Sequence, residues 1–354
     1  MHFRNYLFSF LYRSVRYWVH LFTSFFQSVF LRKRDLESIV DFGDNYLEKI
    51  NEKFGDTVFN SSIPKGLEVD LFGLEFKSPL ISASFKSEEY MLDIWLKLGL
   101  GGVTFKTIMS EKRKGNNRPR LQQIRLDRQK ALVNSLGLPG MGLDSFIPYI
   151  EKTKIWNYNR PVGISIGGEN HLEYINNIKK INKSLISLNK KYFYEINISC
   201  PNTDSGLSVG DDLFQFEELI NELSTISDVP MGIKISPDWK DTHLQSIADI
   251  IKGFDKMFIN AGNTHYINLA DTSLNKNELP RNGGGLSGGP LLPRTIAIIN
   301  LLKEFDIPIL ATGGISDAEH LRAAKAAGAT FFGMATSLIM DPYCIPKLNR
   351  ALTQ

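Results

Sequence analysis

Apolar residues recur in short runs through most of the chain. From about residue 67 onward, eight runs rich in Val, Ile, Phe and Met are bounded by Gly, Pro, Asn or Ser: 79–84, 102–107, 161–167, 193–199, 231–236, 257–262, 308–313 and 330–336. Most are continuously apolar, which is typical of strands covered on both faces of a parallel sheet. Stretches with helical spacing separate most of them: 88–98, 171–188, 214–225, 241–252, 293–304 and 317–327, with a last helix near 344–352.

This alternation predicts the fold. Eight strands with intervening helices close a (β/α)8 TIM barrel, an α/β fold that often extends over about 250 residues as one domain. We therefore assign residues 67–354 to the barrel and residues 1–66 to an N-terminal helical extension. The connection 108–160 is much longer than an ordinary loop, and we expect a lid or an insertion there.

The first 34 residues have a different pattern. Their polar positions recur every three or four residues, which predicts an amphipathic helix with a wide apolar face: Asn5, Ser9, Arg13, Arg16, His20, Thr23 and Gln27. The longest uncharged run, 17–31, is shorter than the roughly 20 residues that a membrane-crossing helix needs. A second helix is expected at about 36–54.

The charge is also divided unevenly. The whole chain carries +3, but residues 1–34 contain six Arg and Lys and no acidic residue. Basic and aromatic side chains together favour an anionic lipid surface. We therefore expect peripheral contact of residues 1–34 with the cytoplasmic side of a membrane; packing on the protein's own core or on a second subunit and a targeting peptide are the alternatives. A soluble cytoplasmic protein, or a mitochondrial one in a eukaryote, is the corresponding alternative location.

Composition excludes other classes of protein. The low net charge argues against nucleic-acid binding. Two cysteines cannot form a disulfide framework, so a reducing compartment is expected. The six histidines have no metal-ligand spacing, and no metal site is predicted. The stretch 112–125, rich in Arg and Lys, is interpreted as a solvated loop face, and Cys344 as a structural residue.

In a TIM barrel, the chemistry lies at the carboxyl ends of the strands. Two lysines, Lys106 and Lys234, lie at such ends. Each ammonium would need an anionic partner inside the barrel mouth, for which a flavin that becomes anionic on reduction is one candidate. Small residues follow the last two strands, and with the Gly-rich run 282–289 they favour a phosphate site. Tight βα turns and a solvated lysine at the rim are the alternatives.

Cys200 follows the fourth strand and is flanked by Asn197 and Asn202. Asparagine side chains both donate and accept hydrogen bonds, which suits a flat imide or amide substrate. A thiol at this position could act as a general base, whereas a buried thiol that only fills space is the alternative.

Several motifs, in order along residues 67–345, resemble those of dihydroorotate dehydrogenases, the FMN enzymes of pyrimidine synthesis. They are Gly-Asn-Asn-Arg-Pro-Arg at 115–120, Asn-Ser-Leu-Gly-Leu-Pro at 134–139, Asn-Ile-Ser-Cys-Pro-Asn-Thr at 197–203, Gly-Gly-Leu-Ser-Gly at 284–288 and Thr-Gly-Gly-Ile at 312–315. The family has soluble forms with a cysteine base and membrane-bound, quinone-using forms with a serine base. Cys200, Lys106 and 134–139 resemble the soluble forms, whereas the aromatic N-terminal helices and 284–288 resemble the membrane forms.

The resemblance implies oxidation of dihydroorotate to orotate in de novo UMP synthesis. Cys200 would remove the proton from C5 while hydride leaves C6 for the flavin, with Lys106 as a further catalytic residue. The residues implied in substrate binding are Lys106, Asn134, Gly137, Leu138, Asn197, Asn202 and Asn260. Those implied in FMN binding are Ala83, Ser84, Lys106, Asn197, Lys234, Ser287, Gly288, Gly313, Gly314, Ala335 and Thr336. The implied electron acceptor is a quinone or fumarate, and a homodimer is left open.

Three positions depart from the family pattern. Phe85 stands where the family usually has Gly, and Gly140 where it usually has Asn. Ala261 stands where the family usually has Ser or Thr. These departures support an alternative, a flavin oxidoreductase of the same fold that acts on another cyclic amide or enoate. A non-catalytic barrel bound to a membrane surface is the alternative from a different class.

Overall fold

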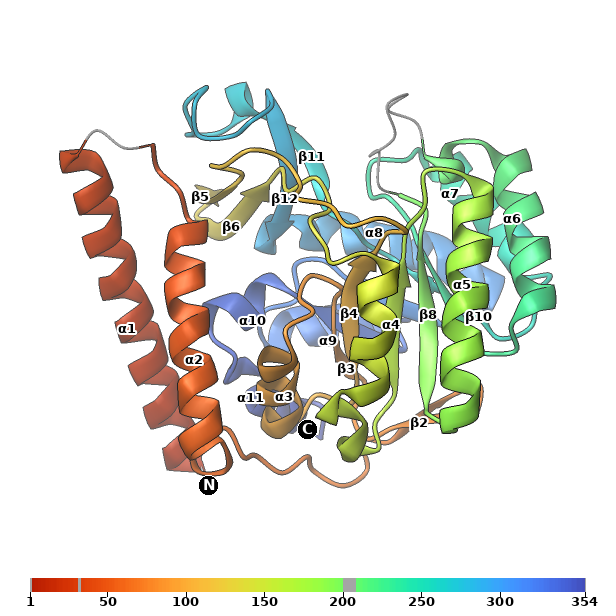
Figure 1. Ribbon diagram of the computed structural model, residues 1–354, viewed down its shortest axis with the longest axis horizontal. Helices are drawn as coiled ribbons and strands as arrows, with labels where there is room; N and C mark the ends of the chain where they lie inside the picture. Colours follow the sequence, from red (N-terminus) through yellow and green to blue (C-terminus); the bar gives the residue numbers. More distant parts are fainter. Residues whose placement is uncertain (1, 31–32, 200–207, 354) are drawn as a thin grey trace.

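The computed structural model describes residues 2–30, 33–199 and 208–353. Its central sheet consists of eight parallel strands in the order β3-β14-β13-β10-β9-β8-β7-β4 (Figure 1). A bridge between Ile81 and Gly102 joins the two outer strands, so the sheet closes into a barrel. The strands are β3 (Leu80–Ser82), β4 (Val103–Ile108), β7 (Val162–Ile166), β8 (Tyr192–Asn197), β9 (Met231–Lys234), β10 (Met257–Asn260), β13 (Ile309–Thr312) and β14 (Phe331–Met334). The predicted TIM barrel is confirmed.

Helices cover the outside of the barrel. They are α3 (Glu89–Leu98), α4 (Leu143–Lys152), α5 (His171–Leu185), α6 (Leu213–Ile226), α7 (Asp241–Ile251), α8 (Leu292–Leu302), α9 (Ala318–Ala327), α10 (Thr336–Met340) and α11 (Cys344–Ala351). Local chemistry sets their ends: Asp317 accepts hydrogen bonds from two backbone N–H groups at the start of α9, and Gly328 ends it with φ of +119°.

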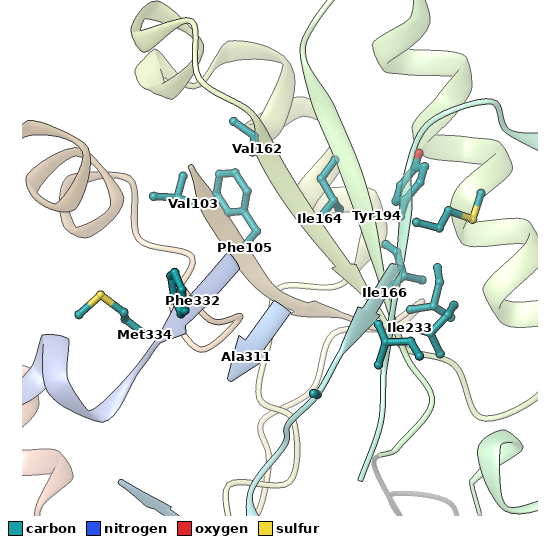
Figure 2. Close-up of a cluster of buried hydrophobic side chains, with 14 of the residues drawn as sticks. Val103, Phe105, Val162, Ile164, Ile166, Tyr194, Ile233, Ala311, Phe332 and Met334 are labelled. Carbon is teal, nitrogen blue, oxygen red and sulfur yellow. The ribbon is translucent and has the colours of Figure 1, made fainter. Parts of the chain in front are cut away.

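Side chains of the strands separate into two cores because successive residues point to opposite faces. Outward residues pack against the helices, as Figure 2 shows for Val103, Phe105, Val162, Ile164, Ile166, Tyr194, Ile233, Phe332 and Met334. A second cluster, which includes Phe193, Phe258 and Phe331, packs with the hairpin of β1 (Val69–Leu71) and β2 (Leu74–Phe76). The barrel interior is therefore apolar at its amino end, which leaves the carboxyl end for polar groups.

The long connection 108–160 is an insertion with its own structure. It contains the hairpin of β5 (Leu121–Leu126) and β6 (Gln129–Asn134), followed by α4. These strands join β11 (His265–Asn268) and β12 (Gly283–Gly288) in an antiparallel sheet of order β11-β12-β6-β5 (Figure 1). The Gly-rich run 282–289, interpreted from sequence as a phosphate loop, is thus mostly a strand of this sheet.

The interpretation of 112–125 as a solvated loop face is wrong. Residues 121–126 form β5, and two arginines of the stretch are bound to carboxylates beside the second N-terminal helix, α2 (Glu37–Val58). Arg118 donates hydrogen bonds to Asp35 Oδ2 at 2.7 Å and Asp41 Oδ2 at 3.0 Å. Arg120 donates to Glu37 through both Nε and Nη2. These ion pairs fasten α2 to the insertion.

The first helix, α1 (His2–Val29), lies beside α2 on one flank of the barrel (Figure 1). Its predicted polar stripe faces the protein: Asn5 Nδ2 donates to Ser61 Oγ at 3.3 Å, and Ser9 Oγ donates to Asp341 Oδ2 at 2.7 Å. Its apolar side faces outward, with Phe10 60% and Trp18 52% exposed. Among the described residues, no helix is long and apolar enough to span a membrane.

Candidate active site

A large cavity extends from the carboxyl ends of the strands to the N-terminal helices. Its volume is about 1870 Å³. Its wall includes Lys106 and Thr107 on β4, Asn134 on β6, Ser287 on β12 and Thr336 at the start of α10. The same wall includes residues along both α1 and α2. One cavity therefore connects Lys106, Asn134, Ser287 and Thr336 with the N-terminal extension.

Three segments meet at the predicted phosphate site. Thr336 Oγ1 donates a hydrogen bond to Ser287 Oγ at 3.0 Å. Gly313 and Gly314, directly after β13, have φ of +130° and +82°. A Cβ on Gly314 would lie 2.5 Å from the backbone nitrogen of Leu292, at the start of α8. The backbone conformation and this close approach both require glycine. The neighbouring Gly288 also has a positive φ, and Ala335 directly precedes Thr336.

Lys234 lies in a buried cluster of polar and charged groups. Its Nζ is 3.5 Å from Glu195 Oε1 and donates a hydrogen bond to Ser84 Oγ at 3.0 Å. Glu195 is 2% exposed and accepts hydrogen bonds from Ser84, Ser165 and Asn260. Burial by itself raises the pKa of Glu195, but the charge of Lys234 and these hydrogen bonds outweigh it, so the pKa is lowered and the carboxylate is ionised. Lys234 therefore has an anionic partner within the protein.

The structure fixes two of the predicted substrate-binding asparagines. Asn197 Nδ2 donates to Thr107 Oγ1 at 3.0 Å. Asn260 Nδ2 donates to Glu195 Oε2 at 2.6 Å, and its Oδ1 is buried without a hydrogen-bond partner among the described residues. A buried acceptor without a partner is costly unless a ligand satisfies it. Asn260 thus points to a ligand with an N–H or O–H group.

The loop after β6 contains three further predicted residues. Asn134 Nδ2 donates to the carbonyl oxygen of Gly285 at 3.2 Å, and the residue lines the cavity. Gly137 and Leu138 both have positive φ values, +70° and +50°. A Cβ on Gly137 would lie 2.8 Å from the side chain of Asn116, so this turn also requires glycine.

Lys106 differs from Lys234 in its surroundings. It is half-buried, and burial lowers the pKa of its amine to about 8. No carboxylate of residues 2–30, 33–199 or 208–353 lies within ion-pair distance of its Nζ. An ammonium with this environment, on the wall of the cavity, is suited to bind an anion.

The three departures from the family pattern have visible surroundings. Phe85 lies on the cavity wall, with its ring centroid 5.2 Å from that of Trp95. Gly140 exchanges two backbone hydrogen bonds with Arg113. Ala261 is fully buried, and its N–H donates to the carbonyl oxygen of Leu310.

Cys200 and Asn202 lie outside the described residues. The residue before Cys200 is described: Ser199 Oγ donates to Asn197 Oδ1 at 3.3 Å and accepts from Asn263 Nδ2 at 2.8 Å. Ala83, at the end of β3, is buried beside Ser84, and its N–H donates to the carbonyl oxygen at 334.

Glu195 and Ser165 were not predicted from the sequence as site residues. A signal for Glu195 was present, because an acidic residue within the otherwise apolar run 193–199 must pair or coordinate if that run is a buried strand. Glu195 also shares the inward face of β8 with Phe193 and Asn197, by the two-residue period of a strand.

The polar groups at this end of the barrel fit a flavin. Lys234 uses two of its three N–H donors within the described residues, towards Ser84 and Glu195. Thr312 Oγ1 and Asn260 Oδ1 are buried there with no hydrogen-bond partner in the described part of the chain. The positive-φ glycines after β13 bring the backbone close to the start of α8, where helix N–H groups favour an anion. An anionic ring system with a phosphate satisfies this set of donors and acceptors.

Comparison with known proteins decides the family. The model of the family described as dihydroorotate dehydrogenase matches residues 66–354. This chain belongs to the dihydroorotate dehydrogenase family. As such it is a flavin-dependent oxidoreductase that acts on a CH–CH group.

Two relatives of this chain differ in the electron acceptor that they are named for. The chain is 30% identical over 299 residues to a dihydroorotate dehydrogenase (quinone) of Pseudomonas putida (strain GB-1), which covers 78% of this chain and 82% of the relative. It is 30% identical over 291 residues to a dihydroorotate dehydrogenase B (NAD(+)), catalytic subunit, of Shouchella clausii (strain KSM-K16), over 81% and 92%. The crystal structure of ligand-free DHODH from Eimeria tenella matches with a TM-score of 0.72 at 23% sequence identity. The match covers 87% of this chain and 92% of that one, and it supports the fold.

Proposed function

We propose that this protein oxidises dihydroorotate to orotate in de novo pyrimidine synthesis, with FMN as its flavin. The observation that carries the proposal is the buried cluster of Lys234, Ser84, Glu195 and Asn260 at the carboxyl ends of β8, β9 and β10, in a chain of this family. A single glycine cradle at 313–314 suits the one phosphate of FMN.

Residues at the ends of seven strands would hold the cofactor, which would supply a hydride acceptor when bound. Lys234, Ser84, Ala83, Lys106 and Asn197 would contact its ring system, because they surround the same end of the barrel. The phosphate would be bound by the residues that meet after β12, β13 and β14: Ser287, Gly288, Gly313, Gly314, Ala335 and Thr336.

The substrate would be bound by polar groups of the cavity and the cluster. Lys106, which has no carboxylate partner among the described residues, would pair with the carboxylate of dihydroorotate. Asn134, Asn197 and Asn260 would hydrogen-bond to the ring, with Asn202 and the turn at 137–138 beside them. Cys200 would take the proton from C5 as a general base.

A quinone is the electron acceptor that the N-terminal helices favour. Apolar residues of α1 and α2, among them Val15, Val19 and Phe42, line the cavity that reaches Lys106. Arg16 lies in the same wall; its Nη2 donates to Gln123 Oε1 at 2.7 Å, and its other N–H groups would donate to a quinone carbonyl. An apolar quinone can enter this cavity from lipid.

The outward face of α1 would bind a membrane surface. The polar stripe is used within the protein, and the aromatic residues outside it are exposed: Phe3, Tyr6, Phe10, Trp18, Phe22, Phe25 and Phe26. Exposed apolar area of this extent marks an interaction site, and aromatic residues favour the lipid interface. We therefore propose peripheral attachment to the cytoplasmic side of a membrane.

The central test is the absorption spectrum of the purified protein. FMN bound to the native chain should be bleached by dihydroorotate in the absence of an acceptor. Cys200→Ala should keep the flavin and lose the bleaching, because proton removal from C5 fails. Bound FMN that dihydroorotate leaves oxidised would refute the substrate and favour another cyclic amide or enoate.

Membrane attachment is tested by vesicle sedimentation. The triple variant Phe10→Ser, Trp18→Ser, Phe22→Ser should pellet less with anionic vesicles than the native protein. A matched control is Leu172→Ser, Ile186→Ser, which removes two exposed apolar residues from the barrel flank at α5. Equal sedimentation of all three proteins contradicts attachment through α1.

A separate measurement identifies the electron acceptor: the rate at which the reduced flavin is re-oxidised by a short-chain quinone, by fumarate and by NAD+, measured in parallel.

A further inference from the structure

Glu195 is a buried carboxylate that the proposed reaction does not use. It lies on β8 between the apolar plug at Phe193 and the predicted ligand-binding residue Asn197, and its side chain is 3% exposed. An ionised carboxylate only accepts hydrogen bonds. Each polar group that contacts Glu195 must therefore donate a hydrogen bond to it. A hydroxyl that donates to Glu195 can only accept from its next partner, so the carboxylate also sets hydrogen-bond directions further away.

Two series of hydrogen bonds, called arms below, lead away from Glu195, and the first arm leads to Asn260. Glu195 Oε2 accepts from Asn260 Nδ2 at 2.6 Å. The amide of Asn260 cannot turn over, because its Oδ1 would then face a carboxylate oxygen. Oδ1 is consequently the free end of the amide, buried and without a partner among the described residues. Asn260 can accept from a ligand but cannot donate to it with this end.

The second arm leads to Asn197. Ser165 Oγ lies 2.7 Å from Glu195 Oε1 and must donate its one proton there. The hydroxyl of Thr107, 2.9 Å from Ser165 Oγ, must then donate to Ser165. Thr107 Oγ1 accepts in turn from Asn197 Nδ2 at 3.0 Å. The amide of Asn197 is thereby turned so that its Oδ1 is the acceptor end, which accepts from Ser199 Oγ at 3.3 Å and keeps a second lone pair for a ligand.

Lys234 is the third group that depends on the carboxylate. Its Nζ is 3.5 Å from Glu195 Oε1, and Ser84, which donates to that same oxygen, accepts from Nζ at 3.0 Å. The negative charge of Glu195 balances the ammonium in a buried site, and it reduces the positive potential that Lys234 presents to a ligand.

We propose that Glu195 is a positioning residue that sets the polarity of the active site: it turns the amides of Asn197 and Asn260 so that both offer carbonyl oxygens to ring N–H groups, and it balances the charge of Lys234 beside the flavin. This inference rests on the proposed function. With Oδ1 of both asparagines towards the ligand, the site prefers ligands that donate N–H groups. A dihydropyrimidine ring has such groups.

Glu195→Gln tests the assignment because glutamine has the same shape with one oxygen and one NH2 group. In either orientation of the new amide, its NH2 group faces a group that now donates to Glu195, either Asn260 Nδ2 or Ser165 Oγ. Two donors cannot hydrogen-bond to each other, so the side chains of that arm must reorient or lose the hydrogen bond. The control is Glu278→Gln, which makes the same change at a buried carboxylate between β11 and β12. Three quantities are measured on the flavin-loaded proteins: FMN content, the midpoint potential of the bound flavin, and the dissociation constant of orotate from the flavin spectrum.

We expect Glu195→Gln to keep FMN, to bind orotate at least tenfold more weakly and to raise the midpoint potential. The potential rises because the reduced flavin, which carries negative charge, no longer lies near the carboxylate; a tenfold shift of the two-electron equilibrium corresponds to about 30 mV. Glu278→Gln should leave all three quantities unchanged. Native values of both the potential and the orotate affinity in Glu195→Gln overturn the proposal.

Ser165→Ala separates the two roles and serves if Glu195→Gln does not fold. It removes the second arm and keeps the charge, so orotate affinity should fall while the midpoint potential stays native. Native orotate affinity in Ser165→Ala overturns the role of that arm. A native chain without flavin, or with flavin that dihydroorotate does not bleach, refutes the proposed function together with this inference, whereas native bleaching with an unaffected Glu195→Gln refutes the inference alone.

Discussion

Lys106 should reduce the stability of the ligand-free protein, and its replacement by methionine should reveal by how much. The ammonium is half-buried without a carboxylate partner among the described residues, and burial lowers its pKa from 10.5 to about 8. Methionine has a similar length and keeps the packing of the apolar stem. We therefore expect Lys106→Met to stabilise the chain while it loses the contact to an anionic substrate.

The magnitude follows from the shift in pKa. One unit corresponds to about 1.36 kcal/mol, so keeping the lysine in this site costs about 3 kcal/mol at pH 7. Between about pH 8 and 10.5 the unfolded chain binds the proton and the folded chain does not, so the stability of the native protein rises with pH in this window. The cost then falls to about 1 kcal/mol near pH 9.5.

Urea unfolding of the ligand-free proteins at pH 7 and pH 9.5 measures both numbers. Lys106→Met should be more stable than the native chain by about 3 kcal/mol at pH 7 and by about 1 kcal/mol at pH 9.5. Lys114→Met, at an exposed lysine of the insertion that follows β4, is the control for the change of residue type. A gain that is absent at pH 7, or equal at the two pH values, would refute a desolvated ammonium at this position.

Three further predictions concern other parts of the molecule. Gly314→Ala should lower the melting temperature and release FMN, because a Cβ with φ of +82° meets a backbone nitrogen at 2.5 Å; calorimetry and flavin content measure this. Asp341→Asn should weaken the docking of α1 through Ser9 by about 1 kcal/mol and speed proteolysis of that helix, without changing cleavage elsewhere. Burial raises the pKa of Cys344, so in the Cys200→Ala variant the remaining thiol should resist alkylation at pH 8 until urea unfolds the chain, as mass spectrometry would show.

The barrel was predictable because each strand and helix has a local signal. Six of the eight strands lie within the predicted apolar runs, and β4 and β8 each extend one residue beyond theirs. The antiparallel sheet at the mouth was not predicted. β12 (Gly283–Gly288) is mostly glycine, which has low strand propensity, and it forms a strand because it pairs with β6 and β11.

The orientation of α1 shows a second limit of periodicity. The spacing of Asn5, Ser9 and Arg16 identifies one face of a helix, but spacing does not say what covers that face. Their partners lie far away in the chain, at Ser61, Asp341 and Gln123. A polar stripe that faces inward is therefore a tertiary property.

Residues of the candidate site could be predicted where they belong to a sequence motif. They could not be predicted where their role depends on contacts between side chains of different strands. Lys234, Asn197 and Asn260 were identified from strand ends and resemblance. Their common partner Glu195 was not, because a single carboxylate in a strand acquires its meaning only when the barrel brings β8, β9 and β10 together.

Under the proposed function, the large cavity also explains why the extension and the barrel form one unit. Dihydroorotate is a water-soluble anion, whereas a quinone partitions into lipid, so one entrance cannot serve both. The cavity that contains Lys106 continues between apolar residues of α2, such as Phe42 and Phe54, which are also exposed at the surface. Because Arg118 and Arg120 fasten α2 to the insertion, the lipid-side entrance is held in place by the same segment that supplies Asn134 to the substrate. Loss of these ion pairs should therefore impair re-oxidation by a quinone more than bleaching by dihydroorotate, and a rapid-mixing comparison of the two half-reactions in Arg118→Ala would contradict this coupling if both rates fell equally.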